Sequence, residues 1–163
     1  MAKKSKKNKE IKGLTHLGSS KTIYKTDYDP SILEAFDTPF PKPHQWVTLH
    51  CPEFTSLCPL TGQPDFAKIT INYIPGKKMV ESKALKLYLF SFRNHGDFHE
   101  KCIETICQDL KKLIKPNYLE VIGSFTPRGG IAIHPFSQTA SSSAYFQKIL
   151  SERKKDYAPG KYC

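Results

Sequence analysis

The stretch 66–92, FAKITINYIPGKKMVESKALKLYLFSF, decides the fold class because its hydrophobic residues change period along it. From Phe66 to Ile74 β-branched and aromatic residues alternate with smaller or polar ones, which predicts a strand that ends at the turn 75–76. From Ser82 to about Phe92 leucines and aromatic residues recur every three or four positions, which predicts an amphipathic helix with Ser82 as its N-cap. A strand is therefore followed closely by a helix.

The same two patterns continue on both sides of this stretch. Upstream, the residues Trp46–His50 predict another strand. Downstream, Asp97 to about Ile114 has an apolar stripe at helical spacing, with Asp97 as the expected N-cap and Glu100 at the capping-box position. Pro116 ends this second helix.

Two more strands are predicted near the end of the core, at 118–126 and 131–136, joined by the turn Pro127-Arg128-Gly129-Gly130. The predicted order is β-β-α-α-β-β. Strands joined by short turns favour antiparallel pairing, and two consecutive helices between them favour packing on one face. The sequence therefore predicts an α+β fold, with an antiparallel sheet and two helices on one of its faces.

The chain of 163 residues is long enough for one domain and too short for two. We expect a basic disordered tail at 1–14, a folded domain at 15–150 and a polar C-terminal tail at 151–163. Prolines and weak periodicity predict that 15–43 is an arm that wraps the surface without a regular element. Half of the net charge of +10 comes from lysines in the first nine residues, which favours a solubilising tail over an anion-binding surface.

The five cysteines form no C-x-x-C pair and do not resemble a secreted disulfide scaffold. No signal-peptide pattern follows the N-terminal lysines. No apolar run approaches the roughly 20 residues that span a membrane. We therefore expect a protein of the cytoplasm that does not enter a membrane.

A long connection between the first two predicted strands, at 54–65, contains a thiol, Cys58, and a carboxylate, Asp65. Long ordered loops on a sheet often carry function, although a single cysteine is more often an inert core residue. With His99 as a base, Cys58 would suit a cysteine hydrolase. With His95 and His99 four residues apart it would suit a zinc site, although a helix start is expected between these histidines.

Lys83 and Lys86 lie three residues apart in the first turns of the predicted helix, so both ammonium groups can face one phosphate. The alternative is that both lysines lie on an ordinary solvated helix face. Without further evidence, two lysines favour this alternative over a phosphate site. The sequence contains no G-x-G-x-x-G motif, so a dinucleotide would not bind in a Rossmann crevice.

Three motifs together resemble the QueF family of NADPH-dependent 7-cyano-7-deazaguanine reductases: CPLTGQPD at 58–65, ESKALKLY at 81–88 and NHGDFHE at 94–100. They occur in the order and with the separation found in that family. The resemblance covers the chain from about Thr15 to Phe136 and is greatest to the short, single-module branch.

The resemblance implies a tunnelling fold (T-fold), whose β-β-α-α-β-β unit agrees with the order predicted above. Proteins of this fold assemble their sheets into a barrel around a central tunnel, with substrate pockets between subunits. A homo-oligomer is thus implied. NADPH and a small deazapurine substrate are the implied partners, without a membrane, a metal or any requirement for nucleic acid.

Carried over residue by residue, the motifs imply roles for nine side chains. Cys58 would be the nucleophile and Asp65 the acid–base group. The implied substrate contacts are Glu81, Ser82, His99 and Glu100, and the implied contacts for the NADPH phosphates are Lys83, Lys86 and, more weakly, Arg128.

These residue types suit the implied reaction. A nitrile carbon accepts a hydride poorly, whereas attack by the Cys58 thiolate, with a proton from Asp65, gives a thioimide that is easier to reduce. Two NADPH molecules then give the aminomethyl product, in a step of queuosine biosynthesis for tRNA. A thiolate beside a carboxylate is repulsive, so we expect one shared proton or a cationic His99 nearby.

Several alternatives stay open. A zinc-dependent, pterin-forming enzyme of the GTP cyclohydrolase I type shares the fold, and a basic RNA-binding protein would use the lysine tail. Cys102, one helical turn from His99, would form a protective disulfide with Cys58 or belong to the core. Glu100 would either cap its helix or bind the guanine-like edge of the base.

Overall fold

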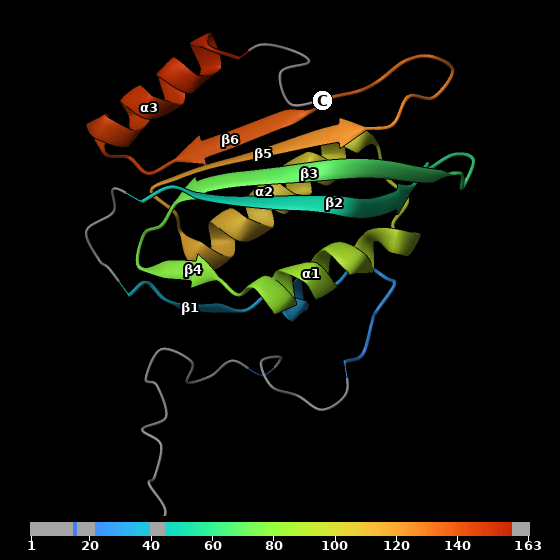
Figure 1. Cartoon of the computed structure of the whole chain (residues 1–163), viewed down its shortest axis with the longest axis horizontal. Helices are drawn as coiled ribbons and strands as arrows, with labels where there is room; N and C mark the ends of the chain where they lie inside the picture. Colours follow the sequence, from blue (N-terminus) through green and yellow to red (C-terminus); the bar gives the residue numbers. More distant parts are fainter. Residues whose placement is uncertain (1–14, 16–21, 40–44, 158–163) are drawn as a thin grey trace, which may run out of the picture.

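The computed structural model describes residues 15, 22–39 and 45–157. The predicted basic tail at 1–14 and Cys163 lie outside these residues. The strands are β1 (Ala35–Asp37), β2 (Val47–Leu57), β3 (Pro64–Ile74), β4 (Lys78–Val80), β5 (Tyr118–Phe125) and β6 (Phe136–Ala140); the helices are α1 (Ser82–Phe90), α2 (His99–Ile114) and α3 (Ala144–Lys155), with the 3-10 turns η2 (Pro30–Ile32) and η3 (Ser91–Asn94) (Figure 1). None of the helices in this part of the chain is long and apolar enough to cross a membrane.

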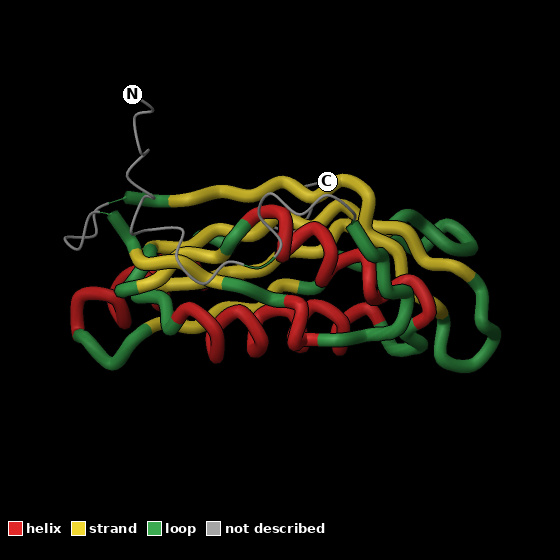
Figure 2. The backbone as a smooth tube through the Cα atoms, turned by 90° about the horizontal axis from the view of Figure 1, so that it is seen from below, coloured by secondary structure: helices red, strands yellow, loops and turns green. Residues whose placement is uncertain are grey.

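A four-stranded antiparallel sheet in the order β2-β3-β5-β6 forms the centre of the fold, and β1 and β4 pair as a separate antiparallel ribbon. α2 packs against β5 and β6, while α1 lies along β2 (Figures 1 and 2). The predicted α+β class is confirmed. The exact predicted order is not, because β1, β4 and α3 add to it.

Alternation along β3 builds the core. Every second residue is buried in one hydrophobic cluster with the apolar sides of α1 and α2, namely Ala67, Ile69, Ile71 and Tyr73. The residues between them are exposed or half-buried. Asp65 lies on the buried face of the same strand, two positions before Ala67, so the polar start of β3 is enclosed as well.

β2 is longer than the predicted strand 46–50 because pairing resumes after an irregularity. The register with β3 is regular as far as Cys51 and resumes at residues 54–57. Pro52, which has no amide hydrogen to donate, lies in this break. Residues 54–57, predicted as loop, therefore belong to the strand, and the connection to β3 shortens to 58–63.

The predicted cap of α1 is wrong. Glu81, and not Ser82, is the N-cap, because its carboxylate accepts hydrogen bonds from the amides of Lys83 at 2.9 Å and Ala84 at 2.7 Å. A negative side chain at this position also suits the positive end of the helix dipole. Glu81 is 6% exposed, and its carboxylate is committed to capping the helix.

The predicted capping box of α2 is also wrong, since the helix begins two residues later than expected. Its N-cap is Phe98, whose side chain makes no capping hydrogen bond. Asp97 instead accepts a hydrogen bond from the Phe98 amide at 2.9 Å. Glu100 therefore caps nothing, and its exposed carboxylate is left for other contacts.

The last predicted strand is displaced, because β6 begins where the predicted strand 131–136 ends. The preceding residues still run beside β5, where the carbonyls of Ile133 and Pro135 accept hydrogen bonds from the amides of Phe125 and Gly123. Pro135 has no N–H to return, so this stretch does not complete a ladder.

The arm contains short regular elements, contrary to expectation, and is fastened to both helices at one carboxylate. β1 and η2 both lie within it. Tyr28 of the arm and Tyr88 of α1 each donate a hydrogen bond to Asp109 of α2 at 2.6 Å. Asn94 donates to the Thr26 hydroxyl at 2.9 Å. The arm thereby holds the segment that leads into α2.

α3 continues five residues past position 150 and is tied to the sheet by an ion pair to a buried glutamate. Arg153 donates to Glu120 at 3.0 and 2.8 Å, and the glutamate is 1% exposed. Burial by itself raises the pKa of Glu120, but hydrogen bonds from Arg153, Tyr118 and Asn72 outweigh it and hold this pKa below its usual range. Leu119 and Val121 point into the α2 side of the sheet, so α3 covers the opposite face.

Gly123 on β5 lets α2 approach the sheet closely. A Cβ at this position would lie 2.7 Å from Cδ1 and 2.8 Å from Cγ1 of Ile103, and 2.9 Å from Cε2 of Phe125. Ile103 is 1% exposed in the core and has little room to move. The distance between α2 and the sheet therefore depends on a residue without a side chain.

Replacing Gly123 with alanine is expected to lower the free energy of unfolding by about 1–3 kcal/mol, because the added methyl group overpacks the core. Urea unfolding followed by circular dichroism measures this loss. Ile103→Val removes the nearest atom, so the double variant should lose less stability than the sum of the two single variants. If the two losses of stability are additive, Ile103 does not determine how closely α2 can approach the sheet at Gly123.

Candidate active site

Cys58 lies in the tight connection between β2 and β3. Its amide donates to the Gln63 carbonyl at 2.8 Å, and its own carbonyl accepts a hydrogen bond from the Gly62 amide at 3.0 Å. Gly62 has a φ of +68°, a conformation that favours glycine. The two hydrogen bonds hold the half-buried thiol at one end of the sheet.

The surroundings of Cys58 lower the pKa of its thiol from 9.0 to about 6. The Thr61 hydroxyl contributes most, followed by the amides of Thr61 and Leu60 and by the Arg128 side chain, all of which stabilise the negative sulfur. Such a thiol is largely ionised at neutral pH and is a good nucleophile.

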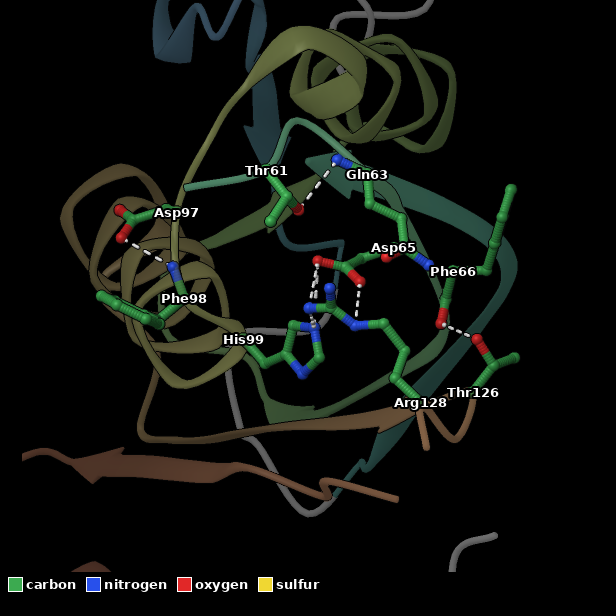
Figure 3. A network of polar contacts seen from close by, with 9 residues as sticks. All are labelled: Thr61, Gln63, Asp65, Phe66, Asp97, Phe98, His99, Thr126 and Arg128. Atoms are coloured by element: carbon green, nitrogen blue, oxygen red, sulfur yellow. Dashed lines mark hydrogen bonds and ion pairs between the residues drawn. The ribbon is translucent and has the colours of Figure 1, made fainter. Parts of the chain in front are cut away.

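The carboxylate of Asp65 is buried at the start of β3 and contacts two basic side chains (Figure 3). Arg128 Nε lies 2.9 Å from Oδ1, and Arg128 Nη2 donates to Oδ2 at 3.1 Å. His99 Nε2 lies 3.1 Å from the same Oδ2. Arg128 thus offsets the charge of Asp65, while His99 is placed to share a proton with it.

His99 is fixed by packing as well as by this contact. Its ring stacks on Phe125 with 3.9 Å between centroids and 8° between planes, and the residue is 6% exposed. Its Nδ1 is buried without a hydrogen-bond partner among the described residues. Nε2 is therefore the nitrogen that serves Asp65.

A short parallel bridge brings His99 to the nucleophile. The Leu57 amide donates to the His95 carbonyl at 2.9 Å, and the Leu57 carbonyl accepts a hydrogen bond from the Asp97 amide at 3.2 Å. Leu57 immediately precedes Cys58. The motifs CPLTGQPD and NHGDFHE therefore meet in the folded chain.

Four of the predicted site residues form one cluster, which we call the nucleophile cluster: Cys58, Asp65, His99 and Arg128. Arg128 was predicted as a contact for the cofactor, but it lies with Asp65 and Cys58 rather than with Lys83 and Lys86. Arg128 and Asp65 are 63 positions apart in the sequence, so no local pattern could reveal their contact. A cofactor contact by Arg128 stays a prediction.

Sequence reasoning missed two residues that adjoin this cluster. The Thr61 hydroxyl makes the largest contribution to the lowered pKa of the Cys58 thiol. Phe98 is 60% exposed, although it directly precedes the buried His99. Only their positions inside the motifs 58–65 and 94–100 could have indicated that they belong to the site, because a threonine or a phenylalanine alone does not suggest it.

Four of the other five predicted residues form a second group in the first turns of α1, whereas Glu100 follows His99 in the first turn of α2. Ser82 and Lys86 line a cavity of about 590 Å³ between α1 and β2, with Lys83 half-buried on the same helix and Glu81 capping it. α1 starts beside β4 and runs along β2 (Figure 1), and the cavity is lined by β2 residues from Thr48 to Phe54 but by none of the nucleophile cluster.

Cys102 has the opposite character to Cys58. It is fully buried in the core, and burial raises the pKa of its thiol to about 12. Both cysteines are free thiols in the structure. Across the described ranges, no three or more histidine, cysteine or carboxylate side chains are grouped to hold a metal ion.

Known proteins resemble this chain in sequence and in fold. The family model of QueF-like proteins matches residues 64–144. A protein of Bdellovibrio bacteriovorus named NADPH-dependent 7-cyano-7-deazaguanine reductase is 60% identical over 161 residues, which cover 98% of this chain and 95% of that protein. Proteins of the same name from Neisseria gonorrhoeae and Bacteroides thetaiotaomicron are 58% and 57% identical over 91% and 88% of this chain, and each is covered to 95%.

A solved structure agrees on the fold. The crystal structure of the archaeosine synthase QueF-Like in the apo form superposes with a TM-score of 0.57 at 20% identity, and covers 63% of this chain and 100% of that chain. This similarity confirms the predicted T-fold class. Because the sequence similarity extends over nearly the whole of both proteins, the chain belongs to the QueF family.

Proposed function

We propose that this chain uses NADPH to reduce the nitrile of 7-cyano-7-deazaguanine to an aminomethyl group through a covalent thioimide on Cys58. The relatives with 57–60% identity are named for this reduction. The observation that carries the mechanism is a thiol with a pKa of about 6 beside the buried pair Asp65 and His99 and the partly exposed Arg128.

Cys58 begins the reaction. Its sulfur attacks the nitrile carbon, so that a C–S bond forms, one C–N π bond breaks and the nitrogen takes a proton. Asp65 passes on this proton, because its Oδ2 lies 3.1 Å from the His99 Nε2 that can replace it. Arg128 contacts both Asp65 and the sulfur, and so offsets the repulsion between the thiolate and the carboxylate.

NADPH supplies the hydrides, and the change from nitrile to amine takes two hydrides and two protons per substrate. Residues of this chain fit such an anionic cofactor, since Lys83 and Lys86 present ammonium groups on α1 and Lys86 lines a cavity of suitable size. Cys58 leaves as a thiolate after the first reduction. The contacts with Thr61 and Arg128 that lower its pKa also stabilise it as a leaving group.

Side chains beside the nucleophile cluster suit the deazapurine ring. Glu100 is exposed and caps nothing, so both of its oxygens are available to a ring N–H and an exocyclic amine. The exposed ring of Phe98 offers a flat apolar surface for stacking. Glu81 fits a substrate contact less well, because its carboxylate already accepts two amide hydrogens.

We also propose that a second copy of the chain completes each working site. Lys83 and Lys86 lie on α1, and none of the nucleophile cluster of the same chain lines the cavity that Lys86 shares with Ser82. β2 and β6 are the edges of the four-stranded sheet as described. Open edges allow sheets of neighbouring copies to join into the barrel of a T-fold homo-oligomer.

The substrate is a free base, so this step needs no nucleic acid even though its product would serve queuosine formation in tRNA. The soluble cofactor and substrate are compounds of the cytoplasm. We place the reaction there.

Mixing the protein with 7-cyano-7-deazaguanine in the absence of NADPH should give a new near-ultraviolet absorbance band and a mass increase equal to the substrate. Cys58→Ala should abolish both, and Asp65→Asn should slow the band by about 100-fold or more because proton transfer is lost. Cys51→Ala is the matched control, since burial raises the pKa of the Cys51 thiol. A thioimide formed by the Cys58→Ala variant would contradict the mechanism.

The rate at which iodoacetamide alkylates Cys58 should follow its thiolate fraction. Because the pKa is lowered, the rate should be near its maximum above pH 7 and fall as the pH drops through about 6. Thr61→Val should move this midpoint upward, toward 9.0, whereas Thr61→Ser keeps the hydroxyl and should leave it nearly unchanged. Peptide mass spectrometry assigns the alkylated cysteine. An unchanged midpoint in Thr61→Val would refute the role of the hydroxyl.

A further inference from the structure

The cavity between α1 and β2 contains more than the predicted lysine site requires. Besides Ser82 and Lys86, it is lined by a second cation, Arg93, and by aromatic residues that include Tyr24 and Phe90. None of the nucleophile cluster lines it. Its volume of about 590 Å³ is in the range of sites for small ligands and nucleotide portions.

The two aromatic rings and the two cations are arranged in pairs. Tyr24 and Phe90 lie 4.7 Å apart between centroids at an angle of 60°. The guanidinium of Arg93 lies 4.0 Å from the centroid of Phe90, and Lys86 Nζ donates to the Tyr24 hydroxyl at 3.3 Å. Aromatic surface beside a planar cation suits an adenine ring next to a phosphate.

The cations are also spaced for two separate phosphate groups. Lys83 and Lys86 are one helical turn apart on α1, whereas Arg93 lies in η3, which follows α1, and lines the same cavity as Lys86. A dinucleotide phosphate carries its extra 2′-phosphate at a distance from the pyrophosphate. One group of cations cannot serve both positions equally well.

We propose that Arg93 binds the 2′-phosphate of NADPH and, with Tyr24 and Phe90 around the adenosine, makes the enzyme specific for NADPH over NADH. The inference rests on the proposed function and assigns the residues that bind the adenosine end of its cofactor. Arginine suits this task because its planar fork binds phosphate through two parallel hydrogen bonds. The carboxylate of Glu53, on the same cavity wall, offers an acceptor for a ribose hydroxyl.

The order of residues along α1 and η3 agrees with this orientation. Ser82, predicted to contact substrate, begins α1, Lys83 and Lys86 follow for the pyrophosphate, and Arg93 comes last, in η3. The nicotinamide end would then point toward Ser82. A second copy would bring its Cys58 to that end of the cavity.

Calorimetry with two probes tests the inference without turnover. Adenosine 2′,5′-bisphosphate and 5′-AMP differ only by the 2′-phosphate, and the wild type should bind the former about tenfold more tightly or better, the usual size for a charged hydrogen bond. Arg93→Gln should bring the ratio near one, and Arg93→Lys should keep part of it. Lys101→Gln removes an exposed cation of α2 outside the cavity and should keep the full ratio.

The kinetic counterpart is the ratio of kcat/KM for NADPH to that for NADH, which should fall about tenfold or more in Arg93→Gln, mainly through the KM for NADPH. A thermal melting curve shows that each variant is folded. An unchanged probe ratio in folded Arg93→Gln, or no preference in the wild type, would overturn the inference. If the wild type prefers the bisphosphate but reduces no nitrile, the proposed function fails and the assignment of Arg93 stands.

Discussion

Two backbone hydrogen bonds at Leu57 hold the proposed site together. They join the end of β2 to the segment before α2, and so bring the turn that carries Cys58 to the helix start that carries His99. These two parts of the chain are about 40 residues apart, and neither bond depends on a side chain. The distance of 3.1 Å between Asp65 and His99 follows from this bridge together with the pairing of β2 and β3.

Charge within the nucleophile cluster is balanced by one cation that serves two anions. A buried carboxylate without a partner would be costly, and a thiolate beside it would add repulsion. Arg128 meets both needs from a turn after β5, where Gly129 and Gly130 have φ values of +57° and +81°. These glycines allow the chain to reverse so that the guanidinium reaches back over Asp65, and the same side chain adds to the hydrogen bonds from Thr61 and Leu60 that lower the pKa of the Cys58 thiol.

Local patterns predicted the parts of the structure that local physics determines. The alternation along β3 and the helical period of α2 are such cases, and the motifs identified the family. The cap of α1 was missed because Glu81 and Ser82 are neighbours that can both cap a helix, and only the folded backbone decides between them. The position of Arg128 and the start of β6 depend on register and long-range contacts, which no window of sequence contains. α3 has no fully buried residue, so its apolar pattern was weak.

The carboxylate of Asp109 has a consequence for how the protein would lose activity under stress. It accepts hydrogen bonds from Tyr28 and Tyr88, and so a residue of the arm is tied to partners 81 and 60 positions away. A segment attached by a few such contacts can detach as a unit while the sheet stays intact. Its departure would release Asn94 and loosen the approach to His99. Inactivation is therefore expected to begin in a state that still has its four-stranded sheet, and to reverse when the arm docks again.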